Sequence, residues 1–297
     1  MEEAVRELGY RPNAAAQALV RGRPSLVAVV AADTTRYGYS MAIQGVEEEA
    51  RRAGHGVAIS VVDSEDAEVI SRAVDLLLAQ PLAGTVVVEF DPPSRALLDA
   101  LPDHLPVVSV SPVTRPDGVP RVVLDDEQPG RRATEHLLAL GHRTVHHVAT
   151  PSAGRPLGRT GGWLAALEAA GAPVPAVEHA GWDPRSGYEA GLRLASDPLV
   201  TSILCGNDEL AIGVLHALAV SGRRVPDDVS VVGFDGTAMS EFTSPPLTTV
   251  RQDFGALGRT AYRLLQDVIA GRQSREPQHI DAELVVRASS GPPPSAG

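Results

Sequence analysis

The feature that most constrains the fold of this chain is a repeated alternation of short apolar runs with amphipathic stretches. The first run, from Leu26 to Ala32, is apolar throughout, as in a strand of a parallel sheet that is covered on both faces. A helix is predicted to follow from Ser40 to Ala53, and Gly54 ends it. This alternation predicts right-handed βαβ crossovers and a doubly wound parallel sheet of the α/β class.

The alternation continues along the chain in two series. In the first we predict further strands at 57–62, 84–89, 107–111 and 121–124 and helices at 65–78 and 94–101. In the second we predict helices at 128–140, 159–170, 186–195, 209–220 and 254–270, with strands at 144–149, 202–205, 229–234, 248–251 and 280–286. Two such units predict two lobes with a cleft between the carboxyl ends of their strands, where ligands of these sheets bind.

Composition excludes several classes of protein. With 297 residues, of which 43% are hydrophobic and 21% charged, the chain is long and apolar enough for two globular lobes. It has no apolar run long enough to span a membrane and no signal-peptide core, so we expect it in the cytoplasm. Cys205 is its only cysteine and it contains no lysine, which excludes an intrachain disulfide, a P-loop lysine and a Schiff-base enzyme.

Enzyme motifs are also missing from the sequence. It contains no Gly-x-Ser-x-Gly elbow, no His-Glu-x-x-His zinc helix and no Gly-x-Gly-x-x-Gly fingerprint. We therefore predict that the chain is not an enzyme and needs no cofactor or metal ion.

The amino-terminal stretch has a charge unlike that of the rest of the chain. The net charge is −11, yet residues 10–24 carry three arginines and no acidic residue. Asn13 is a good N-cap for a short alanine-rich helix that Gly22 ends. Leu19 between arginines suits the minor groove of DNA, where an apolar wedge separates bases and arginines meet phosphates. From the residues alone, an alanine-rich linker is an equally good interpretation.

Five segments carry a resemblance to a known family. They are residues 7–16 (ELGYRPNAAA), 135–142 (EHLLALGH), 207–213 (NDELAIG), 226–235 (PDDVSVVGFD) and 246–253 (PLTTVRQD). In this order and spacing they are similar to the LacI/GalR family of bacterial transcription regulators, and the resemblance covers nearly the whole chain.

The resemblance implies a domain organisation with a periplasmic-binding-protein-like core. Residues 1–24 would be a headpiece remnant and hinge helix, and the rich Pro, Ser and Gly content of residues 290–297 predicts a disordered tail. The amino-terminal lobe would comprise residues 25–124 plus 252–277, and the carboxyl-terminal lobe residues 125–250 plus 279–289.

The resemblance also implies operator DNA as a partner and a homodimer. In the family, two hinge helices pair in the minor groove, and the residue that matches Leu19 intercalates. The implied DNA contacts are Asn13, Ala16, Leu19, Arg21 and Arg23. The family's helix-turn-helix lies upstream of Met1, so either the start is truncated or the reading helix has been lost, and we expect this chain to bind DNA weakly.

Four candidate residues for binding a small effector lie in the second series. Asp235 and Asn207 follow predicted strands and suit the hydroxyls of a polyol, although each is also a good turn or capping residue. Arg159 matches an arginine that reaches the effector in the family. Trp182 matches a position where some members stack an aromatic ring on a sugar, although a partly buried tryptophan is at least as common.

Three further candidates lie in the first series. Asp33 is either a strand-end ligand or a turn residue, and Tyr39 offers a ring where relatives often carry Asn-Pro-Phe-Phe. Ser111 stands where several relatives have an acid or another strongly polar residue. The favoured function is a LacI-type repressor with a sugar effector in the cleft; the alternative is a periplasmic-type sugar-binding receptor without a role at DNA.

Overall fold

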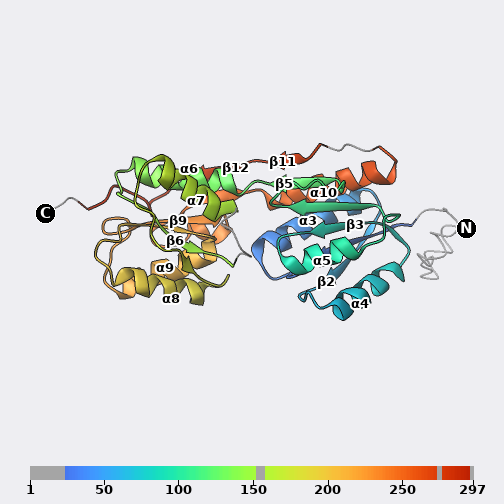
Figure 1. Cartoon of the computed structure of the whole chain (residues 1–297), viewed down its shortest axis with the longest axis horizontal. Coiled ribbons are helices and arrows are strands. Elements are labelled where there is room, and N and C mark those ends of the chain that lie inside the picture. The colour runs from blue at the N-terminus through green and yellow to red at the C-terminus, as the bar shows by residue number, and fades with distance from the viewer. Residues whose placement is uncertain (1–23, 152–157, 273–275, 295–297) are drawn as a thin grey trace, which may run out of the picture. The chain divides into compact units, whose positions relative to one another are not determined.

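The chain divides into two compact α/β units, which each contain one mainly parallel sheet. The computed structural model describes residues 24–151, 158–272 and 276–294. Unit 1 comprises residues 1–124 and 254–279, and unit 2 comprises residues 125–253 and 280–297 (Figure 1). The predicted class of two doubly wound parallel-sheet lobes is confirmed. The predicted DNA contacts lie outside the described residues: Asn13, Ala16, Leu19, Arg21 and Arg23.

Unit 1 contains a six-stranded sheet in the order β11-β5-β4-β3-β1-β2. Strands β1 to β5 pair in parallel, and four helices of the described residues connect or cover them. In chain order the elements are β1 (Leu26–Ala31), α3 (Tyr37–Arg52), β2 (Gly56–Val61), α4 (Ala67–Leu78), β3 (Leu82–Val88), α5 (Pro92–Ala100), β4 (Val107–Ser111), β5 (Arg121–Leu124), α10 (Phe254–Ile269) and β11 (Gln278–Ile280).

Unit 2 contains a six-stranded sheet in the order β12-β10-β9-β8-β6-β7. All neighbours pair in parallel except β12, which is antiparallel to β10. In chain order the elements are α6 (Glu127–Ala139), β6 (His146–Ala149), α7 (Gly158–Ala169), β7 (Glu178–His179), α8 (Pro184–Ala195), β8 (Ser202–Cys205), α9 (Asp208–Val220), β9 (Ser230–Asp235), the 3₁₀ helix η1 (Ala238–Glu241), β10 (Thr248–Gln252) and β12 (Ala282–Val285).

The core of unit 2 lies on both faces of its sheet. Val231 on β9 belongs to a cluster with the buried residues of α8 and α9, whereas its neighbour Val232 belongs to a cluster with α6 and α7. Successive side chains of a strand point to opposite faces, so an uninterrupted apolar run fills both clusters. The sequence signal used to predict these strands therefore has a direct packing cause.

Glycines let the helix pairs approach closely. A Cβ on Gly258 of α10 would lie 2.0 Å from the carbonyl oxygen of Ala42 on α3, and one on Gly162 of α7 would lie 2.0 Å from that of Glu127 on α6. A Cβ on Gly213 of α9 would meet the carbonyl oxygen of Pro184 on α8 at the same distance. These positions accept only glycine, because any side chain would push the two backbones apart.

The structure corrects the prediction for the carboxyl-terminal part of the chain. The single strand predicted at 280–286 is two strands, β11 in the first sheet and β12 in the second, because the chain changes units between them. Ser290 and Gly291, placed in the tail, are instead tied to unit 2: Ser290 Oγ lies 3.0 Å from His136 Nε2, and the Gly291 N–H donates to Ser230 Oγ at 2.9 Å. The short elements β7 and η1 are additions to the predicted set.

Candidate functional site

Polar side chains gather at the carboxyl edge of the unit 2 sheet. Asn207 follows β8, Asp235 ends β9 and Gln252 ends β10, and these three strands are neighbours in the sheet. Arg159 lies in the first turn of α7, the helix that follows β6. Parallel strands present their carboxyl ends at one edge, which is why residues 93 positions apart, such as Arg159 and Gln252, come into contact.

Arg159 is the centre of this cluster. Its Nε donates to Asp126 at 3.1 Å, its Nη2 donates to Gln252 at 3.0 Å, and its Nη1 lies 2.9 Å from Asp235 Oδ1. Nη1 also donates to the Gly206 carbonyl oxygen, and the guanidinium lies 4.1 Å from the centre of the Phe234 ring. Burial disfavours its charge, but the ion pairs with Asp126 and Asp235 outweigh burial and raise the pKa of Arg159.

Asp126 and Gln252 are site residues that the sequence analysis missed. Gln252 uses both ends of its amide, because its oxygen accepts from Arg159 and its nitrogen donates to Asp126 at 2.6 Å. In the sequence, Asp126 is an acidic residue before a predicted helix, with nothing that marks it as a ligand. Gln252 lies in the family segment 246–253, but no role was predicted for it. The available signal was their place near two of the three predicted crossovers of the chain, those near 124 and 252.

Asp235 is the least ordinary residue of the cluster. Its φ of 102° makes it the one non-glycine residue with positive φ in the described part of the chain. Burial, together with the nearby carboxylates of Asp208 and Asp126, raises its pKa from 3.8 to about 7 in spite of Arg159. A carboxyl group with this pKa both accepts and donates hydrogen bonds near neutral pH.

Asn207 combines a structural bond with remaining capacity for a ligand. Its Oδ1 accepts from the Leu210 N–H at 2.7 Å, which makes it the N-cap of α9, and its Nδ2 donates to the Trp182 carbonyl oxygen at 3.0 Å. A primary amide has two donors and two acceptor lone pairs, so these bonds use half of its capacity. Trp182 is half-buried beside it.

The three candidates in unit 1 are engaged within that unit. Asp33 accepts from the Thr35 N–H at 2.8 Å and pairs with Arg36 at 3.0 Å, the geometry of a turn residue. Tyr39 is buried, and its hydroxyl donates to the Asp91 carboxylate while burial raises its pKa. Ser111 is buried and its hydroxyl accepts from the Val113 N–H at 3.3 Å.

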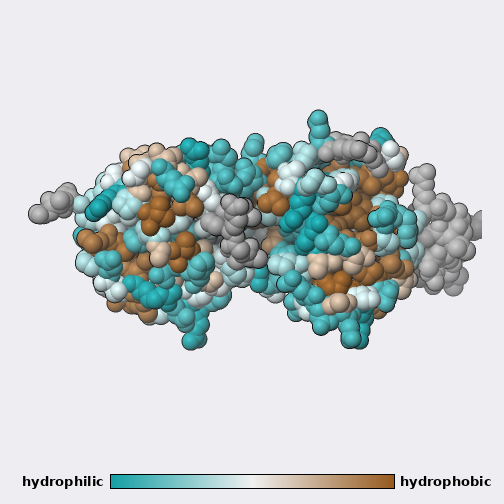
Figure 2. Space-filling model, viewed as in Figure 1, coloured by the Kyte–Doolittle hydropathy of each residue, from teal (hydrophilic) through white to brown (hydrophobic). Residues whose placement is uncertain are grey.

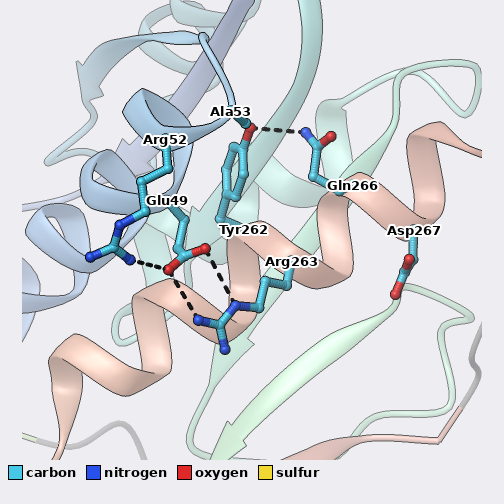
Figure 3. Close-up of a pocket in the computed structure, with 7 residues that line it drawn as sticks. All are labelled: Glu49, Arg52, Ala53, Tyr262, Arg263, Gln266 and Asp267. Carbon is cyan, nitrogen blue, oxygen red and sulfur yellow. Dashed lines mark hydrogen bonds and ion pairs between the residues drawn. The ribbon is translucent and has the colours of Figure 1, made fainter.

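A separate hollow of about 430 Å³ lies on unit 1 between α3 and α10 (Figure 3). Its charged side chains pair with each other, because Glu49 accepts from both Arg52 and Arg263. Gln266 donates to the Tyr262 hydroxyl at 3.0 Å in the same hollow. Its lining includes none of the residues predicted to bind an effector.

Two other kinds of site are missing from the described residues. Within them, no three His, Cys, Asp or Glu side chains are placed to hold a metal ion. Over the same ranges, every helix is too short or too polar to cross a membrane.

Comparison with known proteins gives a consistent result. Residues 134–290 match the model of the periplasmic binding protein-like domain. The chain is 30% identical to the lactose operon repressor of Escherichia coli K12 over 98% of its length and 81% of that protein. It is 32% identical to the transcriptional repressor PurR of Mannheimia succiniciproducens over 97% of its length and 87% of that protein.

Solved structures agree with these relatives. A lac repressor dimer bound to operator and the anti-inducer ONPF is similar with a TM-score of 0.86 at 29% identity, covering 95% of this chain and 99% of that one. A complex of the transcriptional regulator CelR with cellobiose gives 0.75 at 30% identity, covering 97% and 89%. The curated relatives are regulators of transcription rather than enzymes. The chain therefore belongs to the LacI/GalR family of transcription regulators.

Proposed function

We propose that this chain is a transcription repressor whose unit 2 binds a small polyhydroxylated effector, a sugar, at the carboxyl edge of its sheet. The observation that carries the proposal is the cluster in which Asp126, Asp235 and Gln252 surround Arg159. It alternates hydrogen-bond donors with acceptors, and a sugar hydroxyl can pair with either.

The charge of the cluster favours a neutral ligand. The carboxylates of Asp126 and Asp208 both act on Asp235, and the Arg159 guanidinium opposes them. A phosphate or carboxylate ligand would add negative charge to a buried site that already holds an excess of it. Hydroxyl groups carry no such penalty.

Arg159 is held in place before a ligand arrives. Among the described residues, its guanidinium donates hydrogen bonds to Asp126, Gly206 and Gln252, and its Nη1 forms an ion pair with Asp235. A preorganised donor binds at a smaller entropic cost than a mobile one.

We further propose that five other residues contribute to binding of the effector. Asp33, Tyr39 and Ser111 belong to unit 1, and Trp182 and Asn207 belong to unit 2. The contacts of Tyr39 and Ser111 within unit 1 support an indirect effect, in which they fix the backbone at the carboxyl edge of that sheet.

The proposed function includes operator DNA and a second copy of the chain. The arginine-rich stretch with Leu19 supports the first, together with the operator that the similar lac repressor dimer binds. Exposed apolar side chains on β2 and α4 support the second, and Figure 2 shows hydrophobic surface in the part of unit 1 where these elements lie. They are Ile59, Val61, Val69, Leu76 and Leu78.

Thermal unfolding in the presence of sugars tests the proposal. The probes are a panel of neutral mono- and disaccharides that includes cellobiose, with glucose 6-phosphate as the anionic comparison. We expect at least one neutral sugar to raise the Tm of the wild type with increasing concentration. The rise should vanish in Arg159→Met and Asp235→Asn.

A surface variant controls for changes in stability. Glu283→Gln alters an exposed ion pair with Arg251 and should keep the full response to the sugar. A rise in Tm with glucose 6-phosphate but with no neutral sugar would contradict the proposal. So would a rise in Tm that persists in both Arg159→Met and Asp235→Asn.

A further inference from the structure

A buried carboxylate without an ion-pair partner, that of Asp208, lies close to the cluster around Arg159. Asp208, in the first turn of α9, has no exposed surface, and in the described ranges no arginine or histidine pairs with it within 4 Å. It is held by hydrogen bonds instead: Oδ2 accepts from the Thr237 N–H at 2.6 Å and the Thr237 hydroxyl at 3.0 Å, and Oδ1 accepts from the Thr249 hydroxyl at 2.5 Å.

Two features of this region are each unfavourable: the buried charge of Asp208 and the backbone conformation of Asp235. Burying an unpaired charge is costly, and the amino-terminal end of α9 and the three hydrogen bonds offset only part of that cost. The φ of 102° at Asp235 is strained for a residue with a side chain, and Gly236 follows with a φ of 70°. Such strain persists only where the surroundings enforce it.

The hydrogen bonds of Asp208 connect these two features. Thr237, which Asp208 grips by both its N–H and its hydroxyl, comes directly after the strained pair. The sheet leaves room for this contact, because a Cβ on Gly233 would lie 2.3 Å from Asp208 Oδ1. Thr249 lies on β10, the strand beside β9, so the same carboxylate also ties the turn to the sheet.

We infer that Asp208 is a positioning residue, whose carboxylate holds the turn at residues 235–237 so that the Asp235 side chain meets Arg159. The inference rests on the proposed function, in which Asp235 contacts the effector. Asp208 itself is fully buried and reaches the ligand only through this turn.

The charge of Asp208 gives a second expected effect. The charged groups around Asp235 are Arg159 on α7, Asp208 on α9 and Asp126 before α6, with Arg251 opposite on β10 but paired with Glu283. Asp208 and Asp126 both raise the pKa of Asp235. Neutralising Asp208 should therefore move the titration of Asp235 to lower pH.

Two substitutions separate the positioning bond from the charge. In Asp208→Asn the amide oxygen can still accept from Thr237, and the amide nitrogen can donate to the Thr249 hydroxyl, so the turn keeps its support without the charge. Asp208→Ala removes both. Asp228→Asn, which alters a carboxylate held by Arg224 in the same unit, is the matched control.

The readouts are taken by NMR on the full chain without ligand. We expect Asp208→Asn to lower the pH at which the Asp235 carboxyl carbon titrates and to leave hydrogen exchange of the Thr237 amide unchanged. We expect Asp208→Ala to speed that exchange at least about tenfold relative to the amides of β8, the loss of one hydrogen bond to a charged group. The control should change neither readout.

If Asp208→Ala does not fold, Thr237→Val provides a second test of the inference. It removes the hydroxyl bond alone and should speed exchange of its own amide by a smaller factor. An Asp235 titration that is identical in Asp208→Asn and the wild type, or a Thr237 amide that stays equally protected in the variants that lack the bond, would overturn the inference. A sugar panel without any response would instead overturn the proposed function and leave these readouts as they are.

Discussion

Asp235 shows how one residue can combine several unfavourable features. Its side chain is largely but not fully buried, with 13% exposed, it adopts a left-handed backbone conformation, and two other carboxylates act on it. Each of these features costs free energy, and Arg159 offsets only part of the sum. Sites that bind ligands are where such costs are found, because the same groups gain when a ligand satisfies them.

The raised pKa of Asp235 predicts a stability that falls as the pH rises. Between 3.8 and about 7, the folded chain holds a proton on Asp235 that the unfolded chain has lost. This contribution to the free energy of unfolding is complete below about pH 4 and is lost as the pH passes 7. Relative to Asp235→Asn, the wild type should lose up to roughly 4 kcal/mol over this range in urea denaturation. Parallel pH curves for the two proteins would contradict this.

The site residues that could be predicted from the sequence were those with a recognisable signal in their local sequence. Asp235 and Asn207 follow apolar strands, and Arg159 matches an arginine of the family. Asp126 and Gln252 were missed because each is ordinary in its local sequence, and the contact between them spans 126 residues. The role of Asp208 could not be predicted, because its burial and its hydrogen bonds to Thr237 are properties of the folded chain.

At the scale of elements, the helix pairs depend on glycines at their contacts. Gly258→Ala should destabilise unit 1 by about 2 kcal/mol, because the new methyl group would meet the Ala42 carbonyl oxygen and push α10 from α3. The better helix propensity of alanine recovers about 1 kcal/mol at most. Thr260→Ala on the same helix should stay within about 0.5 kcal/mol of the wild type by chemical denaturation. An equal effect of both would show that the contact can relax.

The edge strand β2 gives a prediction for the proposed dimer. Ile59 is 52% exposed on the last strand of the unit 1 sheet, so Ile59→Glu would place a charge in any interface that buries this strand. We expect sedimentation velocity to show a shift from dimer to monomer. Leu199→Glu, at an 82% exposed position of unit 2, is the control and should stay dimeric. A dimer that survives in Ile59→Glu would place the interface elsewhere.

Long apolar strands and capped helices were predictable, whereas short and composite elements were not. The strand at Val107–Ser111 and that at Ser202–Cys205 have the predicted bounds. The two-residue strand β7 is too short to carry a pattern. The predicted strand at 280–286 is interrupted because sheet membership changes at Asp281, and that change depends on which unit each half meets.

At the scale of the whole molecule, the proposed contact with DNA predicts a dependence on salt. Each arginine that meets a phosphate contributes about 0.9 to the slope of log K against log salt. Arg21→Ala and Arg23→Ala should therefore each reduce the slope by about 1, measured by fluorescence anisotropy with a short labelled duplex. Arg272→Ala alters an exposed arginine paired with Asp267 in unit 1 and should leave the slope unchanged. Equal slopes for all the variants would exclude a role of the hinge arginines.

The proposed regulation sets a scale for the effect of an effector. Coupling between two sites is typically about 1–3 kcal/mol, so a sugar bound in unit 2 should change affinity for DNA by roughly 5- to 150-fold. The coupling is reciprocal, and DNA should change the affinity for the sugar by the same factor.

The three passages of the chain between its units also bear on how such a protein can be shortened. Each half is assembled from separated pieces of the gene product, since β11 and β12 complete opposite sheets from one short stretch at the end. A premature stop ahead of Gln278 would strip a strand from each sheet at once. To express either unit alone, the coding segments of its separated pieces would therefore have to be joined in a new gene.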